Sequence, residues 1–292
     1  MSIIENQRHY SLHQKVGFSL RGSGPLYDYL AYQYNYFFLK EQKVTESNQS
    51  SLVLTINENF VREYDTKLKN GNEYFALDSN HELFIWSVGN KRVALDGRAT
   101  LVEQLSINFE SGFNRMKANL ICELVTRLKF AEHDIALVHA ACITKKGEAV
   151  LLPAWKGMGK TAACLKLVEA GYDFMADDRI WISASGEVYA YPRYVVIKDS
   201  NAAFFPQFTT YYIKIKQWLL QLAGKVRCIN RSSLFQRIRR FLIPAKYFYI
   251  EDLYPSVKIV RKTQLGSVVS IVKKERSREI SIESMGSSVL AA

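Results

Sequence analysis

Short apolar runs separated by polar residues dominate the first 108 positions of the chain. The runs read SLVLTI, YFALD, ELFIWSV and KRVALDG, and Asn, Asp or Gly residues stand between them. Runs of this length, bounded by turn residues, are typical of β-strands. The pattern therefore predicts a β-rich N-terminal region over residues 1–110.

The hydrophobic period changes over residues 111–130. An apolar residue recurs every four positions, at Met116, Leu120, Leu124 and Leu128. Ile121 and Val125 lie beside this stripe, so the segment is predicted to be a helix with one apolar face. We expect that face to dock the first half of the chain onto the second.

The next pattern, IALVHAACITKKGEAVLLPAW, has two apolar runs on either side of Lys145-Lys146-Gly147. It predicts two strands joined by a tight turn. A helix is expected from Lys160 to Ala170, with Gly171 at its C-terminal cap. The segment FMADDRIWI then reads as a strand interrupted by two acids.

Composition places the chain among globular proteins. Of its 292 residues, 48% are hydrophobic and 23% charged, which is an ordinary balance. Cys122, Cys142, Cys164 and Cys228 are widely spaced without a CxxC pair, so we expect free thiols rather than a zinc site. His9 and His13 are interpreted as surface histidines, because no third ligand is near.

Localisation is predicted to be cytoplasmic. The N-terminal sequence lacks the basic-then-apolar order of a signal peptide, and no uncharged apolar run approaches the length of a spanning helix. Peripheral association with the inner face of a membrane remains compatible with the sequence.

The formal net charge of +11 implies an anionic partner. Residues 200–250 contain no acid, and their cations are Lys214, Lys216, Lys225, Arg227, Arg231, Arg237, Arg239, Arg240 and Lys246. Interleaved apolar residues predict a basic helical insertion. It would bind an acidic or serine-containing acceptor or, through residues 213–246, an anionic membrane surface, or it would be a solvated insertion. Nucleic acid is the least favoured partner, because no nucleic-acid motif is present.

The segment PAWKGMGKTAA resembles the end of a phosphate-binding loop. In such loops backbone N–H groups and the N-terminus of the following helix hold the phosphates, Lys reaches the outer phosphates and Ser or Thr holds Mg²⁺. Ala154 stands where the motif has its first glycine. The nucleotide-binding residues predicted here are Ala154, Trp155, Lys156, Gly157, Met158, Gly159, Lys160, Thr161 and Ala162. A glycine-rich turn before an ordinary helix is the alternative interpretation.

Two charged features strengthen the nucleotide interpretation. Asp177 and Asp178 follow the apolar run FMA, where adjacent acids are unfavourable unless a cation such as a Mg²⁺–nucleotide meets them. His139 lies in the apolar strand LVHAA and would orient a catalytic carboxylate if it faces these acids.

Residues 137–182 together resemble the HPr kinase/phosphorylase family, which has a strand histidine, a hairpin, a phosphate loop, a helix and an Ala-Asp-Asp ending in this order. The resemblance implies a mixed α/β fold with a P-loop kinase core over residues 111–292, related to phosphoenolpyruvate carboxykinase. It implies ATP- and Mg²⁺-dependent phosphorylation of a hydroxyl, usually serine. Asp177 matches the base, Asp178 and Thr161 the metal ligands, and His139 and Lys160 the assisting groups.

Departures from the family point to a divergent member. Ala154 replaces the loop glycine, and Ala162 stands where the bacterial enzymes usually carry glutamate. The chain is therefore more similar to the HPr-kinase-like proteins of lasso-peptide or polysaccharide pathways, with a peptide, protein or small molecule as acceptor. The family also implies a homo-oligomer.

Two further questions stay open at the sequence level. Arg193 and Lys198 are additional candidates for phosphate or substrate contact, with solvated charges as an equal alternative. The rival function for the whole chain is a non-catalytic nucleotide-binding regulator or scaffold.

Overall fold

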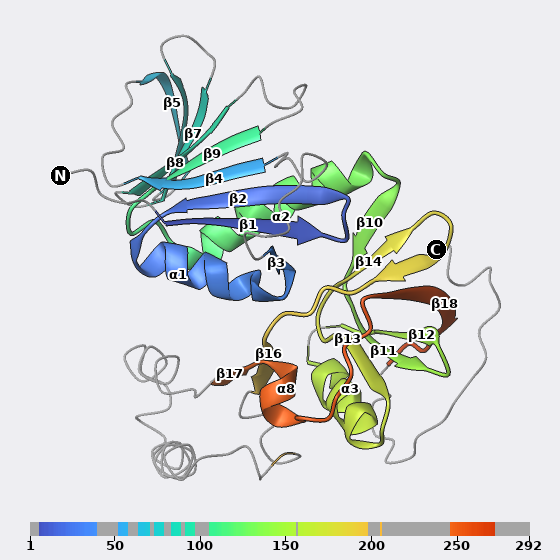
Figure 1. Ribbon diagram of the computed structural model, residues 1–292. Helices are drawn as coiled ribbons and strands as arrows, with labels where there is room; N and C mark the ends of the chain where they lie inside the picture. The colour runs from blue at the N-terminus through green and yellow to red at the C-terminus, as the bar shows by residue number, and fades with distance from the viewer. Residues whose placement is uncertain are drawn as a thin grey trace, which may run out of the picture.

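The computed structural model describes residues 6–39, 52–57, 64–70, 73–78, 83–88, 91–96, 105–155, 157–197, 205 and 246–271. Over these ranges the chain is a strand-rich, mixed α/β protein with mixed sheets (Figure 1). The predicted fold class is confirmed at this level, whereas the domain boundary at residue 110 stays a prediction.

The first large sheet has nine strands in the order β3-β1-β2-β4-β9-β8-β7-β6-β5. Its strands are β1 (Asn6–Leu12), β2 (Val16–Gly22), β3 (Phe38–Leu39), β4 (Leu52–Asn57), β5 (Tyr64–Asn70), β6 (Glu73–Asp78), β7 (Leu83–Val88), β8 (Lys91–Asp96) and β9 (Leu105–Glu110). The β2–β4 and β4–β9 pairs are parallel, and the others are antiparallel. All four predicted strand runs are confirmed as β4, β6, β7 and β8.

Two helices and a 3₁₀ turn accompany this sheet: α1 (Gly24–Gln33), η1 (Asn35–Phe37) and α2 (Arg115–Ala131). Pro25 stands in the first turn of α1, where its missing N–H is tolerated. The Asn114 side chain accepts a hydrogen bond from the Lys117 N–H and caps α2. We call the first sheet with α1, η1 and α2 the first half of the molecule, and the second sheet with the elements after it the second half. One apolar core joins the two halves, because Phe18 and Val125 belong to the same buried cluster as Trp181.

The predicted apolar face of α2 is wrong, although the helix itself is confirmed. Met116, Leu120, Leu124 and Leu128 have exposed fractions of 79%, 52%, 55% and 56%. The buried face is formed by Ala118, Ile121, Cys122, Val125 and Phe130. Both faces are apolar, and the tertiary packing of α2 buries the stripe that contains Ile121, Val125 and Phe130.

The second large sheet has seven strands in the order β10-β14-β15-β18-β12-β11-β13. Its strands are β10 (Ile135–Val138), β11 (Ala140–Lys145), β12 (Glu148–Pro153), β13 (Asp173–Ala176), β14 (Ile180–Ser183), β15 (Glu187–Tyr189) and β18 (Lys262–Val268). Only β12 and β18 are parallel neighbours. The remaining elements are α3 (Lys160–Glu169), β16 (Val195–Ile197), β17 (Lys246–Phe248) and α8 (Ile250–Leu253).

An interrupted ladder runs through this sheet. β10 pairs antiparallel with β14 up to Val138↔Ile180, and pairing resumes in the same register at Cys142↔Ala176 between β11 and β13. The two segments are therefore one long antiparallel pair with a gap. The gap contains residues 139–141 on one side, beginning with His139, and residues 177–179 on the other.

The predicted hairpin and the predicted helix are both confirmed. Lys146 and Gly147 have φ of 54° and 86° in the turn between β11 and β12, the left-handed conformation that a tight hairpin requires. After α3, Gly171 at φ 89° donates its N–H to Val168 O, and the Tyr172 N–H reaches Leu167 O. This is the Schellman arrangement, which satisfies the last carbonyls of the helix.

The structure bears on the expected free cysteines, whereas the expected basic segment lies outside the described residues. Cys122, Cys142 and Cys164 are free and buried, as expected, and burial raises the pKa of the Cys142 thiol to about 12. Among the described residues, no helix is long and apolar enough to span a membrane. Residues 206–245 and Lys198 lie outside the described residues, so the predicted basic insertion and its membrane contact stay predictions.

Candidate functional site

Strand order brings the predicted site residues to one end of the second sheet. β11 is antiparallel to both of its neighbours, with Ala140 opposite Pro153 of β12 and Cys142 opposite Ala176 of β13. The start of β11 therefore lies beside the ends of β12 and β13. His139 precedes β11, the loop 154–159 follows β12, and the two acids follow β13, so all three segments meet there.

The loop between β12 and α3 needs glycine at two positions. Gly157 and Gly159 have φ of 89° and 93°, which side chains disfavour. An added Cβ would meet nothing within 4 Å at either position, so the space in front of the loop is open. The Met158 N–H is donated to Trp155 O at 3.2 Å and closes a turn. The first amides of the ten-residue helix α3 then point into this space.

Lys160, His139 and Asp178 form a compact charged group. Lys160 Nζ lies 2.6 Å from His139 Nε2, which lies 2.9 Å from Asp178 Oδ1. One ring nitrogen cannot accept from the ammonium and donate to the carboxylate at once, so these are alternative hydrogen bonds. Lys160 Nζ also lies 3.6 Å from Asp178 Oδ1, and Lys160 is buried.

Thr161 and Asp177 form the second pair. The Thr161 hydroxyl donates to Asp177 Oδ2 at 3.1 Å. A hydroxyl and a carboxylate oxygen at this separation, next to a second carboxylate on Asp178, are the hard oxygen ligands that Mg²⁺ takes together with phosphate oxygens. The residues present therefore fit Mg²⁺ bound with a nucleotide. The described residues contain no cluster of three His, Cys, Asp or Glu side chains able to hold a metal.

Sequence reasoning missed a charged bridge from α2 to this site. Arg179 Nε lies 3.4 Å from Asp178 Oδ2, and its guanidinium also pairs with the buried carboxylate of Glu123. Burial lowers the pKa of Arg179. Glu123 pairs with Arg127 at 2.7 Å as well. No local pattern could reveal the Glu123–Arg179 contact, because it joins a helix of the first half to a turn of the second.

Arg193 lies apart from the loop residues. Its guanidinium donates to Gln33 Oε1 at 3.2 Å and to Asn119 Oδ1 at 3.0 Å, and lies 3.5 Å from Glu123. These contacts hold the segment between β15 and β16 against α1 and α2. The structure therefore gives Arg193 a packing environment and brings it into contact with none of the loop residues.

The loop side chains differ strongly in exposure. Trp155 is 83% exposed, whereas Ala154 and Ala162 are half-buried, and Ala162 packs against the core around Leu165. Lys156 lies outside the described residues. Trp155 is therefore available to a ligand at the mouth of the loop, and Ala162 contributes no charge there.

Comparisons with known proteins assign no family. No protein-family model matches this chain, and no curated protein matches it. The resemblance over residues 137–182 therefore stays an expectation, which rests on the residues and their geometry.

Proposed function

We propose that this chain is an ATP-dependent kinase that phosphorylates a hydroxyl, with a serine-bearing peptide, a protein or a small molecule as acceptor. One observation carries the proposal. Lys160 and Thr161 at the start of α3 lie within hydrogen-bonding distance of groups from two other segments, His139 and the Asp177–Asp178 pair. Phosphoryl transfer needs this combination of phosphate-binding cation, hydroxyl and carboxylates.

Each residue then has a distinct task. Lys160 binds the outer phosphates, which removes it from His139 and frees Nε2–H for donation to Asp178. Asp177 accepts the proton of the acceptor hydroxyl. Thr161 and Asp178 hold Mg²⁺, whose charge neutralises the phosphate oxygens. Arg179 keeps Asp178 in place through its contact at 3.4 Å.

The division of labour between the two acids is the sharpest point of the proposal. The resemblance assigns the base to Asp177, while the hydrogen bond from His139 goes to Asp178. Asn at either position keeps the size of the side chain but removes its charge. We expect Asp177→Asn to lower turnover by about 10²- to 10⁴-fold with ATP binding retained.

The experiment incubates the protein with Mg²⁺ and γ-labelled ATP, alone and with serine-containing peptides, and measures ATP binding separately. Asp177→Asn and Asp178→Asn are compared with Asp173→Asn, which lies at the start of the same strand. If Asp178→Asn alone abolishes turnover while keeping Mg²⁺–ATP affinity, the base is Asp178. ATP binding without phosphorylation of any acceptor would favour a non-catalytic nucleotide-binding regulator. Absence of ATP binding would contradict both the kinase and the regulator.

A further inference from the structure

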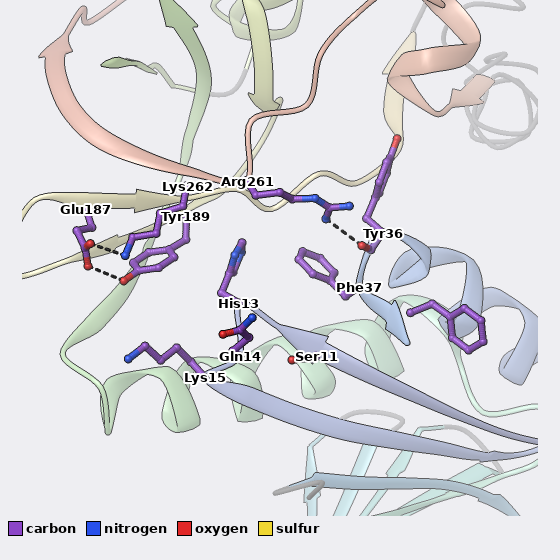
Figure 2. Close-up of a pocket in the computed structure, with 11 residues that line it drawn as sticks. Ser11, His13, Gln14, Lys15, Tyr36, Phe37, Glu187, Tyr189, Arg261 and Lys262 are labelled. Carbon is purple, nitrogen blue, oxygen red and sulfur yellow. Dashed lines mark hydrogen bonds and ion pairs between the residues drawn. The ribbon is translucent and has the colours of Figure 1, made fainter. Parts of the chain in front are cut away.

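A cavity of about 630 Å³ lies between the two halves of the molecule (Figure 2). Four segments line it: the tip of the β1–β2 hairpin, the turn of η1, the β15 strand and the start of β18. Its residues are Ser11, His13, Gln14, Lys15, Tyr36, Phe37, Phe38, Glu187, Tyr189, Arg261 and Lys262. None of them belongs to the phosphate loop or its acids. The volume lies within the range of small-molecule sites.

The hairpin tip enters this region in an uncommon conformation. His13 and Gln14 both have positive φ, 55° and 60°, where short hairpins usually carry Asn or Gly. The Lys15 N–H closes the turn onto Leu12 O. His13 Nε2 donates to Ala190 O at 2.7 Å, which anchors the tip to the second half. The interpretation of His13 as a surface histidine is therefore wrong.

The state of the His13 ring follows from these contacts. Burial lowers its pKa to about 4, and the nearby charges of Arg261 and Lys262 act in the same direction. The ring is therefore neutral at physiological pH. Because Nε2 carries the proton that is donated to Ala190 O, Nδ1 is left as a hydrogen-bond acceptor.

Positive charge exceeds negative charge around the cavity. Lys15, Arg261 and Lys262 line it, and Glu187 is the one carboxylate among the described residues that do. Glu187 pairs with Lys262 and accepts a hydrogen bond from the Tyr189 hydroxyl at 2.7 Å. In the described part of the chain, neither Lys15 nor Arg261 forms a salt bridge. Lys15 still interacts electrostatically with Glu187, and Arg261 with Glu251. Figure 2 shows Lys15 and Arg261 on opposite sides of the His13 ring, so Arg261 is the cation beside the aromatic rings that an anion would meet.

Aromatic rings form the remaining walls. Figure 2 shows the His13 ring between Phe37 and Tyr189, with ring centroids 5.6 Å and 5.3 Å from its own. Arg261 lies 5.9 Å from the ring centres of Tyr36 and Phe37 and donates to Tyr36 O at 2.9 Å. Burial lowers the pKa of this guanidinium, so an anion beside it would compensate its desolvation.

We propose that this cavity is a second binding site, which takes a small anion carrying a planar ring: the phosphate ester of a nucleoside or of a simple aromatic alcohol. Arg261 would hold the phosphate group, and Lys15 would add positive charge from the far side of the His13 ring (Figure 2). The Tyr36, Phe37, His13 and Tyr189 rings would contact the planar ring. His13 Nδ1 would accept a hydrogen bond from the ligand. The inference is independent of the kinase proposal, because the two sites share no residue.

The test measures binding of AMP, phenyl phosphate, inorganic phosphate and adenosine by calorimetry. The variants are Lys15→Gln at the exposed hairpin tip and Arg261→Lys and Arg261→Gln at the wall. The matched control is Arg21→Gln, an exposed position at the opposite end of the same hairpin. A Lys160→Ala background removes the phosphate-loop cation, so binding at that loop is separated from binding in the cavity. Circular dichroism checks that each variant is folded.

We expect AMP or phenyl phosphate to bind, and to bind about tenfold more weakly after Arg261→Gln, which removes the charged contact to the phosphate. Arg261→Lys should keep part of the affinity, and Lys15→Gln on the far side of His13 should lower it less than Arg261→Gln. Arg21→Gln should change nothing in the Lys160→Ala background. Preference for AMP identifies a nucleotide ligand, and equal binding identifies an aryl phosphate. The proposal is overturned if no ester binds, if inorganic phosphate binds as tightly as the esters, or if folded Arg261→Gln retains full affinity.

Discussion

The candidate site at loop 154–162 and the cavity between the halves differ in their balance of charge. At the loop, Lys160, Arg179 and His139 all lie close to Asp178, and Asp177 accepts a hydrogen bond from Thr161. Among the described residues that line the cavity, there are three cations and one carboxylate, Glu187, and aromatic rings complete the wall. A balanced cluster suits a ligand that brings its own cation, such as Mg²⁺–ATP. A cationic, ring-lined cavity suits a bare anion.

The largest expected effect concerns Glu123, which pairs with Arg179 beside the loop site and does not line the cavity. Glu123→Gln leaves the guanidinium groups of Arg179 and Arg193 without their buried carboxylate. We expect it to lower the free energy of unfolding by about 3 kcal/mol, measured by urea denaturation. Glu132→Gln, which breaks a surface pair with Lys129 on the same helix, should change it by less than about 0.5 kcal/mol. Equal effects would show that the Glu123 cluster contributes little.

The next effect tests whether the loop glycines serve binding or only folding. Gly159→Ala and Gly171→Ala each place a methyl group at a φ near 90° in open space. Both should lower stability by about 1–2 kcal/mol in thermal unfolding. Only Gly159→Ala should also abolish ATP binding, because Gly171 caps the far end of α3. Loss of ATP binding in both variants would attribute the effect to the helix as a whole.

His13 gives the stability of the protein a pH dependence that originates at the cavity. Its pKa is about 4 in the folded protein and 6.5 in the unfolded chain. The unfolded state therefore binds more protons between these values, and stability falls as the pH drops from 6.5 to 4. The slope is at most about 1.4 kcal/mol per pH unit. Denaturation across this range should show a shallower slope for His13→Gln than for the wild type, and an unchanged slope would contradict the burial of a neutral His13 ring.

The smallest effect concerns the one carboxylate of the cavity. Two hydrogen bonds lower the pKa of Glu187, with the larger effect from Lys262 and the smaller from Tyr189. Glu187 is therefore charged at neutral pH. Glu187→Gln releases Lys262 and should tighten phenyl phosphate binding a few-fold at low salt, with the gain lost at high salt. Weaker binding would mean that Glu187 positions Lys262 for the ligand. ATP binding at the loop should not change.

Local signals account for the parts of the structure that the sequence predicts well. The turn at Lys146-Gly147, the cap at Gly171 and the acids after β13 each depend on residues close in sequence, so period and turn chemistry reveal them. The face of α2 could not be predicted in the same way. Leu120 and Ile121 belong to two apolar stripes of one helix, and only the tertiary packing determines which stripe is buried.

The features that the sequence did not predict depend on contacts between residues far apart in the chain. The cavity joins Lys15, Tyr36, Tyr189 and Arg261, which no periodicity connects, and His13 gained its environment from Ala190 on the other half. In the sequence, Glu123 resembles any acidic residue of a helix, and only the fold shows that it pairs with Arg179. Contacts of this kind depend on the docking of the two sheets, whereas the loop site depends on strands that are neighbours in both sequence and space.

The gap in the long antiparallel pair of the second sheet has a consequence for hydrogen exchange. Residues 177–179 lie where pairing stops between Val138↔Ile180 and Cys142↔Ala176. Their amides should exchange with solvent faster than those of the flanking strands, because local opening there breaks few ladder bonds. A nucleotide bound at the loop would contact this gap, so its amides should gain more protection than any other part of the sheet. Deuterium uptake thus reports occupancy of the site without requiring turnover or knowledge of the acceptor.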